Sequence, residues 1–174
     1  MEFIEYPDRD MLILDLANQI ADDLGHALHH KERVTLSVPG GTTPGPVFDE
    51  LSSVDLDWVR VNVCLNDERW VPETSERSNT TLLRQRLLVH KAAKAQLLPM
   101  YAPFDTPEDG LASLEPAFQK SLPIDVLMVG MGADMHTASL FPGADQLELA
   151  LSPNSPILVA MRAPGAPEPR MEQQ

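Results

Sequence analysis

The sequence DVLMVGMGADMHTASLFPG, residues 125–143, joins a short apolar run to a dense group of polar side chains. Its residues 126–129 (VLMV) have the length and composition of a buried strand. Two glycines follow, and Asp134 and His136 then stand two residues apart. Ligands of open α/β sheets bind where loops leave the carboxyl ends of strands. The stretch is therefore a candidate functional loop, although a glycine-rich turn with a structural histidine also fits it.

Two other segments show the same order of strand and polar loop. Residues 34–38 (VTLSV) predict a strand that is followed by PGGTTP at 39–44. The alternating valines of residues 59–65 predict a second strand, followed by NDERWVP at 66–72. Each loop alone could be an ordinary surface turn. Because carboxyl ends of parallel strands share one side of a sheet, the three loops can converge into a site for a small phosphorylated substrate handled by proton transfer.

The rest of the chain alternates helical and strand patterns, which predicts an α/β fold with a largely parallel sheet. Leucines and isoleucines recur every fourth residue between residues 10 and 30, the pattern of an amphipathic helix. We predict further helices after Thr43 (as N-cap), after Ser78 or Asn79, after Thr106 and at 145–151, with strands at 97–101, near an edge, and 157–161. Pro116 is expected to kink or divide the helix after Thr106, and the N-terminal residues could add an edge strand. We expect one domain over 1–174 with an irregular tail at 163–174.

Composition excludes several classes of function. The chain has 174 residues and a net charge of −13, which argues against a nucleic-acid or anionic-membrane binder. No apolar run reaches the length of a membrane span. The single cysteine, Cys64, fits a reducing compartment and predicts a cytoplasmic protein. His26 and His30 have a spacing that could bind a metal, but no further ligand accompanies them, so we expect no metal.

Three segments carry a family resemblance. PGGTTP, NDERWVP followed by SERSNTTLLR, and GMGADMHTASLFPG resemble, in this order, the signature segments of the 6-phosphogluconolactonases. The resemblance runs from the N-terminal helix to about Arg170. It implies a Rossmann-like α/β fold, with an open, mostly parallel sheet and helices on both faces, related to the sugar-phosphate isomerases and deaminases. It also implies hydrolysis of 6-phospho-D-glucono-1,5-lactone to 6-phosphogluconate in the oxidative pentose phosphate pathway, with no cofactor.

The resemblance implies roles for named residues. His136 would be the general base that activates water, and Asp134 would orient its imidazole. A helix N-terminus contributes only about 0.3–1 kcal/mol to anion binding, so an acidic protein needs an added cation. Its guanidinium fork makes Arg69 the first choice. The expected phosphate-binding residues are Gly40, Gly41, Thr42, Arg69 and, as second choice of cation, Arg77. The expected pocket residues are Asp67, Asn79 and Gly132, while Glu68 could simply pair with an arginine.

Two departures from the family pattern stand out. Met135 lies where the family often has glycine, and methionine is unfavourable there if the backbone needs positive φ. The resemblance also stops near Met171, so we expect a C-terminally incomplete sheet that lacks its last elements and one basic phosphate ligand. An inactive homologue that only binds sugar phosphates is therefore an alternative. A second is an amino-sugar-phosphate deaminase or isomerase, against which HTASLFP argues. We expect a monomer or weak homo-oligomer.

Overall fold

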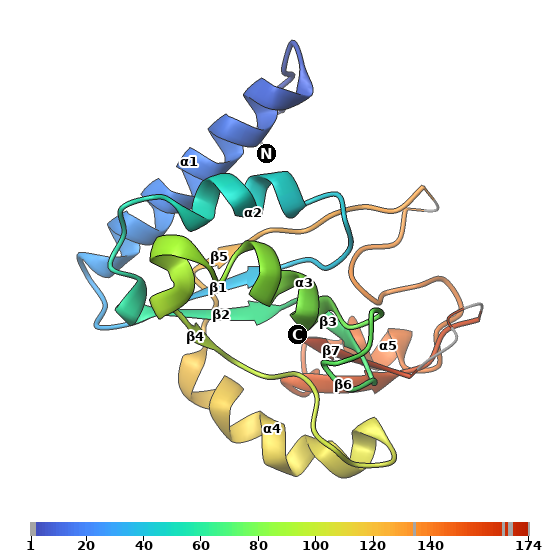
Figure 1. Cartoon of the computed structure of the whole chain (residues 1–174). Coiled ribbons are helices and arrows are strands. Elements are labelled where there is room, and N and C mark those ends of the chain that lie inside the picture. Colours follow the sequence, from blue (N-terminus) through green and yellow to red (C-terminus); the bar gives the residue numbers. More distant parts are fainter. Residues whose placement is uncertain (1–2, 134, 165, 167–168, 174) are drawn as a thin grey trace.

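A four-stranded parallel sheet forms the centre of the molecule (Figure 1). The computed structural model describes residues 3–133, 135–164, 166 and 169–173. The sheet has the order β4-β2-β1-β5. Its strands are β1 (Val34–Val38), β2 (Val61–Leu65), β4 (Gln96–Leu97) and β5 (Val126–Leu127). All residues of β1 and β2 are buried, as expected for central strands of a parallel sheet covered on both faces.

Helices cover the two faces of this sheet. In Figure 1, α1 (Arg9–Leu28) and α2 (Gly45–Ser52) lie above it and α4 (Pro107–Ser121) lies below. The remaining helices are α3 (Asn79–Arg86), α5 (Leu147–Ala150) and the 3-10 turns Trp58–Arg60 and His90–Lys94. The buried side of α1 consists of Ala17, Ile20, Ala21, Leu24 and Leu28, at the spacing that the sequence predicted. The predicted α/β fold with a parallel sheet is therefore confirmed. No helix in the described part of the chain is long and apolar enough to cross a membrane.

A second, antiparallel sheet was not predicted. It has the order β3-β7-β6 and consists of β3 (Asp67–Arg69), β7 (Arg170–Gln173) and β6 (Leu158–Met161). The prediction of an irregular tail at 163–174 is therefore wrong for its last described residues. The polar sequence RMEQ has little strand propensity, but its backbone pairs on both sides and Met171 is buried in the core. Tertiary pairing outweighs local propensity here.

Several predicted boundaries also differ from the structure. The strand expected at 126–129 is only the two-residue β5 at the sheet edge, where Leu127 is 56% exposed. The N-cap of α2 is Pro44 rather than Thr43, and no side chain caps it. Residues 3–8 form no strand. Thr106 caps α4 as predicted, and Pro116 lies inside α4 without dividing it.

Candidate functional site

A cavity of about 720 Å³ lies where the three predicted loops meet at the carboxyl ends of β1 and β5. Most of the predicted site residues line it: Gly40, Gly41, Asp67, Arg69, Asn79, Gly132 and His136. Thr42 is exposed and does not belong to the lining, where Thr43 stands instead. Arg77 is also outside the lining, and Asp134 lies outside the described residues. The structure thus brings the loops together without bringing in every predicted residue.

The glycine loop is shaped by two backbone requirements. Gly41 has φ +81°, a conformation that glycine adopts without steric cost. A Cβ atom on Gly40 would lie 2.0 to 2.2 Å from the side-chain amide of Asn79, so only glycine fits at this contact. Asn79 is held in turn by its Nδ2, which donates to the carbonyl of Asp67 at 3.2 Å. The glycine loop and the start of α3 therefore form one continuous wall.

Glu68 organises the wall beside the glycine loop. Its fully buried carboxylate accepts five hydrogen bonds, from the backbone N–H groups of Arg69, Asn79 and Thr80 and from the hydroxyls of Ser78 and Thr80. The N–H groups of Asn79 and Thr80 belong to the first turn of α3. N–H groups there have no partner within the helix, and a negative charge near them is favourable. Glu68 thus joins β3 to α3. The expectation that it pairs with an arginine is wrong, because none of these five bonds comes from an arginine side chain.

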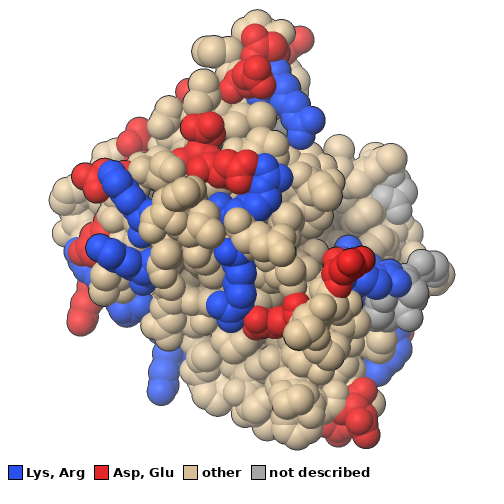
Figure 2. Space-filling view, viewed as in Figure 1, with Lys and Arg blue, Asp and Glu red and all other residues tan. Residues whose placement is uncertain are grey.

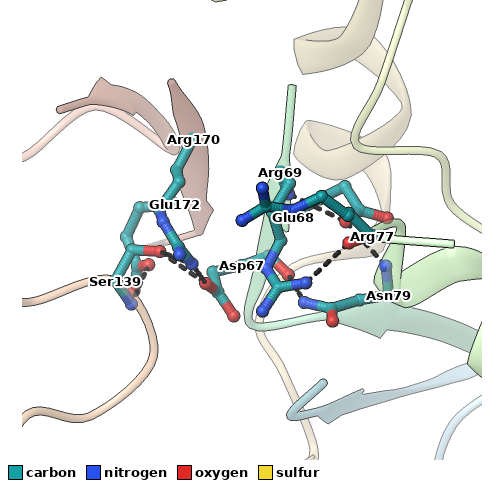
Figure 3. A network of polar contacts seen from close by, with 8 residues as sticks. All are labelled: Asp67, Glu68, Arg69, Arg77, Asn79, Ser139, Arg170 and Glu172. Atoms are coloured by element: carbon teal, nitrogen blue, oxygen red, sulfur yellow. Dashed lines mark hydrogen bonds and ion pairs between the residues drawn. The ribbon is translucent and has the colours of Figure 1, made fainter. Parts of the chain in front are cut away.

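The guanidinium of Arg69 is a positive charge in the cavity lining. Its Nη1 donates to the carbonyl of Arg77 at 2.6 Å, which fixes one arm of the guanidinium (Figure 3). Its Nε is buried and has no acceptor within the described residues. A buried donor without an acceptor is costly, and an anion in the cavity could satisfy it. Arg77 contributes its backbone to this arrangement.

A buried polar cluster lies on the opposite wall (Figure 3). Arg170 on β7 pairs with Asp67 on β3, with Nη1 and Oδ2 3.2 Å apart. Ser139 donates its hydroxyl to Asp67 and its backbone N–H to Oε2 of Glu172, the latter at 2.9 Å. Burial raises the pKa of Glu172 to about 9, and the negative charge of Asp67 adds to the shift, while the Ser139 N–H and Arg170 oppose it. Glu172 is therefore protonated at neutral pH.

The loop that carries His136 is a tight turn. The N–H of Met135 donates to the carbonyl of Gly132, and the N–H of Gly132 donates to the carbonyl of His136, both at 2.9 Å. Met135 has φ +66° and is 77% exposed, so the methionine does occupy a backbone position that favours glycine. The imidazole of His136 stacks on the ring of Phe141, with ring centroids 4.1 Å apart and planes inclined by 25°.

The lining residues that were not predicted include two arginines and one aromatic ring, namely Arg9 of α1, Arg170 and Phe141. In the sequence, Arg170 was marked only as the end of the family resemblance. Nothing in the sequence pointed to Arg9 or Phe141 as site residues. Among the described lining residues, the three arginines Arg9, Arg69 and Arg170 outnumber the one carboxylate, that of Asp67. By contrast, acidic and basic side chains are interspersed among the described residues on the face shown in Figure 2. The positive charge is local to the cavity, as an anionic ligand of an acidic protein requires.

The described residues contain no cluster of three or more His, Cys, Asp or Glu side chains that could hold a metal ion.

Comparison with known proteins identifies the family. A protein-family model described as glucosamine-6-phosphate isomerases/6-phosphogluconolactonase matches residues 7–172. The chain belongs to this family. It is 42% identical over 168 residues to a 6-phosphogluconolactonase of Mesorhizobium japonicum, covering 95% of this chain and 71% of the relative. A 6-phosphogluconolactonase of Rhizobium meliloti is 43% identical over 163 residues, covering 90% and 70%.

Solved structures agree with this assignment. A crystal structure of a 6-phosphogluconolactonase from Shewanella baltica superposes with a TM-score of 0.92 at 34% identity, covering 97% of this chain and 72% of that one. A 6-phosphogluconolactonase from Thermotoga maritima shares the fold, with a TM-score of 0.75 at 24% identity and coverage of 93% and 72%. The chain thus spans about 70% of the length of the curated relatives quoted above.

Proposed function

We propose that the chain hydrolyses 6-phospho-D-glucono-1,5-lactone to 6-phosphogluconate, a step of the oxidative pentose phosphate pathway. One observation carries the proposal. A histidine, an arginine whose buried Nε has no acceptor among the described residues and a glycine loop line the same cavity. A cavity of about 720 Å³ accommodates one sugar phosphate. The curated relatives are named 6-phosphogluconolactonases, which favours the lactonase over the deaminase or isomerase alternative.

In this proposal His136 acts on water. Its imidazole accepts a proton as the water oxygen attacks the lactone carbonyl, forming a tetrahedral intermediate. The bond from the carbonyl carbon to the ring oxygen then breaks, and the ring oxygen takes up the proton as a hydroxyl. Water has been added across one ester bond, and the histidine is restored. A positioned general base of this kind contributes about 10²–10⁴-fold to the rate. Asp134, outside the described residues, is assigned the role of orienting the imidazole.

The phosphate is assigned to the opposite end of the cavity. Arg69 supplies a charged fork whose Nε has no acceptor among the described residues, and the glycine loop with Gly40 and Gly41 lines the cavity shortly before α2. Thr42 and Arg77 have weaker support, because neither belongs to the cavity lining. Asp67 and Asn79 shape the sugar pocket through the bonds that join β3 to α3 and β7.

The test measures the rate at which freshly prepared lactone is lost and compares it with the rate of spontaneous hydrolysis. The wild-type chain should accelerate this loss, and His136→Gln should abolish the excess, while His30→Gln, at an exposed position just after the end of α1, should not. Arg69→Gln should raise KM for the phosphorylated lactone about tenfold or more and leave KM for unphosphorylated gluconolactone unchanged, with Arg84→Gln as control. A well-folded wild-type chain without acceleration would refute the proposal and favour an inactive sugar-phosphate binder.

The remaining expectations stand as proposals with their own tests. We propose that residues 1–174 form a single domain, and that the chain is a monomer or weak homo-oligomer, which analytical ultracentrifugation can decide. We also propose a cytoplasmic location. Cys64 is buried and unpaired, and burial raises its thiol pKa to about 11, which suits a structural thiol in a reducing compartment. Fractionation of cells followed by immunodetection tests the location.

A further inference from the structure

We propose that Phe141 is a positioning residue that holds the imidazole of His136 in the orientation needed for proton transfer. The inference rests on the proposed function and adds a role for a residue outside the reacting groups. The two rings stack with centroids 4.1 Å apart and an interplanar angle of 25°. Both side chains line the cavity.

Stacking on Phe141 limits how the imidazole of His136 can rotate. The loop that carries His136 is a tight turn closed by two backbone hydrogen bonds, and it includes Met135 at positive φ, where the side chain is strongly exposed. A histidine side chain has two rotatable bonds. Stacking against a fixed ring restricts both at once.

Phe141 is attached to the antiparallel sheet. Its ring packs against a small buried cluster made by Ala144, Ala150, Val159 and Met161, two of which belong to β6. Its backbone N–H donates to the carbonyl of Ser139 at 2.9 Å, and the backbone N–H of Ser139 is bound by Glu172 of β7. The ring is therefore held in place from the antiparallel sheet.

Arg170 holds the same ring from β7. Its guanidinium carbon lies 5.1 Å from the Phe141 centroid, within the range of a cation–π contact. The guanidinium cannot move away easily, because Asp67 pairs with it at 3.2 Å and both side chains are almost completely buried (Figure 3). A physical connection thus runs from the buried ion pair through Phe141 to the imidazole.

A plain wall for the substrate is the competing role for Phe141, because its ring also lines the cavity. The two roles differ in what they change. Loss of a wall weakens substrate binding and raises KM. Loss of a support for the base leaves binding intact and lowers kcat, because misplacement of a catalytic group by about 1 Å can cost 10²-fold.

The first experiment compares Phe141→Leu with Phe141→Tyr, which keeps the stacked ring. Phe141→Leu should lower kcat about tenfold or more with KM changed less than about twofold, and Phe141→Tyr should retain kcat within about twofold. Phe104→Leu, an aromatic position outside the cavity lining, controls for loss of any ring. An unchanged kcat in Phe141→Leu, or a rise in KM alone, would overturn the inference.

The second experiment does not depend on activity. A proton on the His136 ring that lies over Phe141 should show an upfield ring-current shift in the NMR spectrum, assigned among the five histidines by comparison with His136→Gln. Phe141→Leu should remove that shift, and Phe141→Tyr should keep it. An unshifted His136 resonance in the wild-type chain would refute the stacking itself. If the chain lacks lactonase activity, the proposed function fails, while this measurement still decides whether Phe141 orients the imidazole.

Discussion

Replacement of Glu172 by glutamine should change how the stability of the protein depends on pH. Glu172 is 3% exposed and sits beside Asp67 in the buried cluster, so the folded protein keeps its proton up to a pKa of about 9. In the unfolded chain the same carboxyl loses its proton near 4.5. Between these two values unfolding releases one proton, and the free energy of unfolding falls as the pH rises. The contribution of Glu172 to stability is complete below the pKa of its carboxyl in the unfolded chain. It is lost as the pH rises through the pKa of the same carboxyl in the folded protein.

The magnitude follows from the release of one proton. The slope is about 1.4 kcal/mol per pH unit, so the wild-type chain loses about 2–3 kcal/mol between about pH 5.5 and about pH 7.5 from this group. Glutamine has the same shape and no proton to release, and its oxygen can still accept the N–H of Ser139. The difference in free energy of unfolding between Glu172→Gln and wild type should therefore grow by about 2–3 kcal/mol in favour of the variant over that range.

Urea unfolding at several pH values within this range measures the difference directly. Every other ionisable group is present in both proteins, so the contribution of these groups cancels in the difference. Glu76→Gln, at an exposed position, is the matched control and should run parallel to wild type. Parallel curves for Glu172→Gln and wild type, constant within about 0.5 kcal/mol, would show that Glu172 is ionised in the folded protein and would refute the reasoning.

Three further substitutions test the rest of the structure. Glu68→Gln should destabilise the protein by about 3 kcal/mol, because the NH₂ group of the amide would face hydrogen-bond donors. Glu73→Gln, which removes an exposed ion pair, should cost at most about 1 kcal/mol, and urea unfolding compares the two variants. Gly40→Ala should displace the side chain of Asn79 and raise KM for the lactone, and an unchanged KM would mean that this contact has no part in binding. Met135→Gly should raise the free energy of unfolding by about 1 kcal/mol by relieving positive φ, and thermal unfolding that shows no gain would contradict this.

Periodicity and loop composition were sufficient to predict the parallel half of the fold. The apolar stripe of α1 and the buried strands β1 and β2 follow from local spacing, and each was found close to its predicted position. The convergence of the three loops also followed, because parallel strands end on one side of a sheet. His136 and Arg69 were accordingly predicted to share a site, and both line the cavity.

The antiparallel half could not be predicted, because its stability comes from pairing between distant segments. Asp67 and Glu172 are partners across β3 and β7, although they are 105 residues apart in the chain and neither favours a strand. The same pairing buries Arg170 against Asp67 and brings it to Phe141.

The residues to which we assign chemistry, His136 and Arg69, were predicted from the sequence, because their types and their places after strands are local properties. What holds them in place was decided by tertiary structure alone. Glu68 binds the start of α3, Glu172 accepts the backbone N–H of Ser139 in a site where burial raises its pKa, and Phe141 stacks on His136. Each depends on desolvation and on contacts across the fold, and neither quantity is a property of a sequence segment.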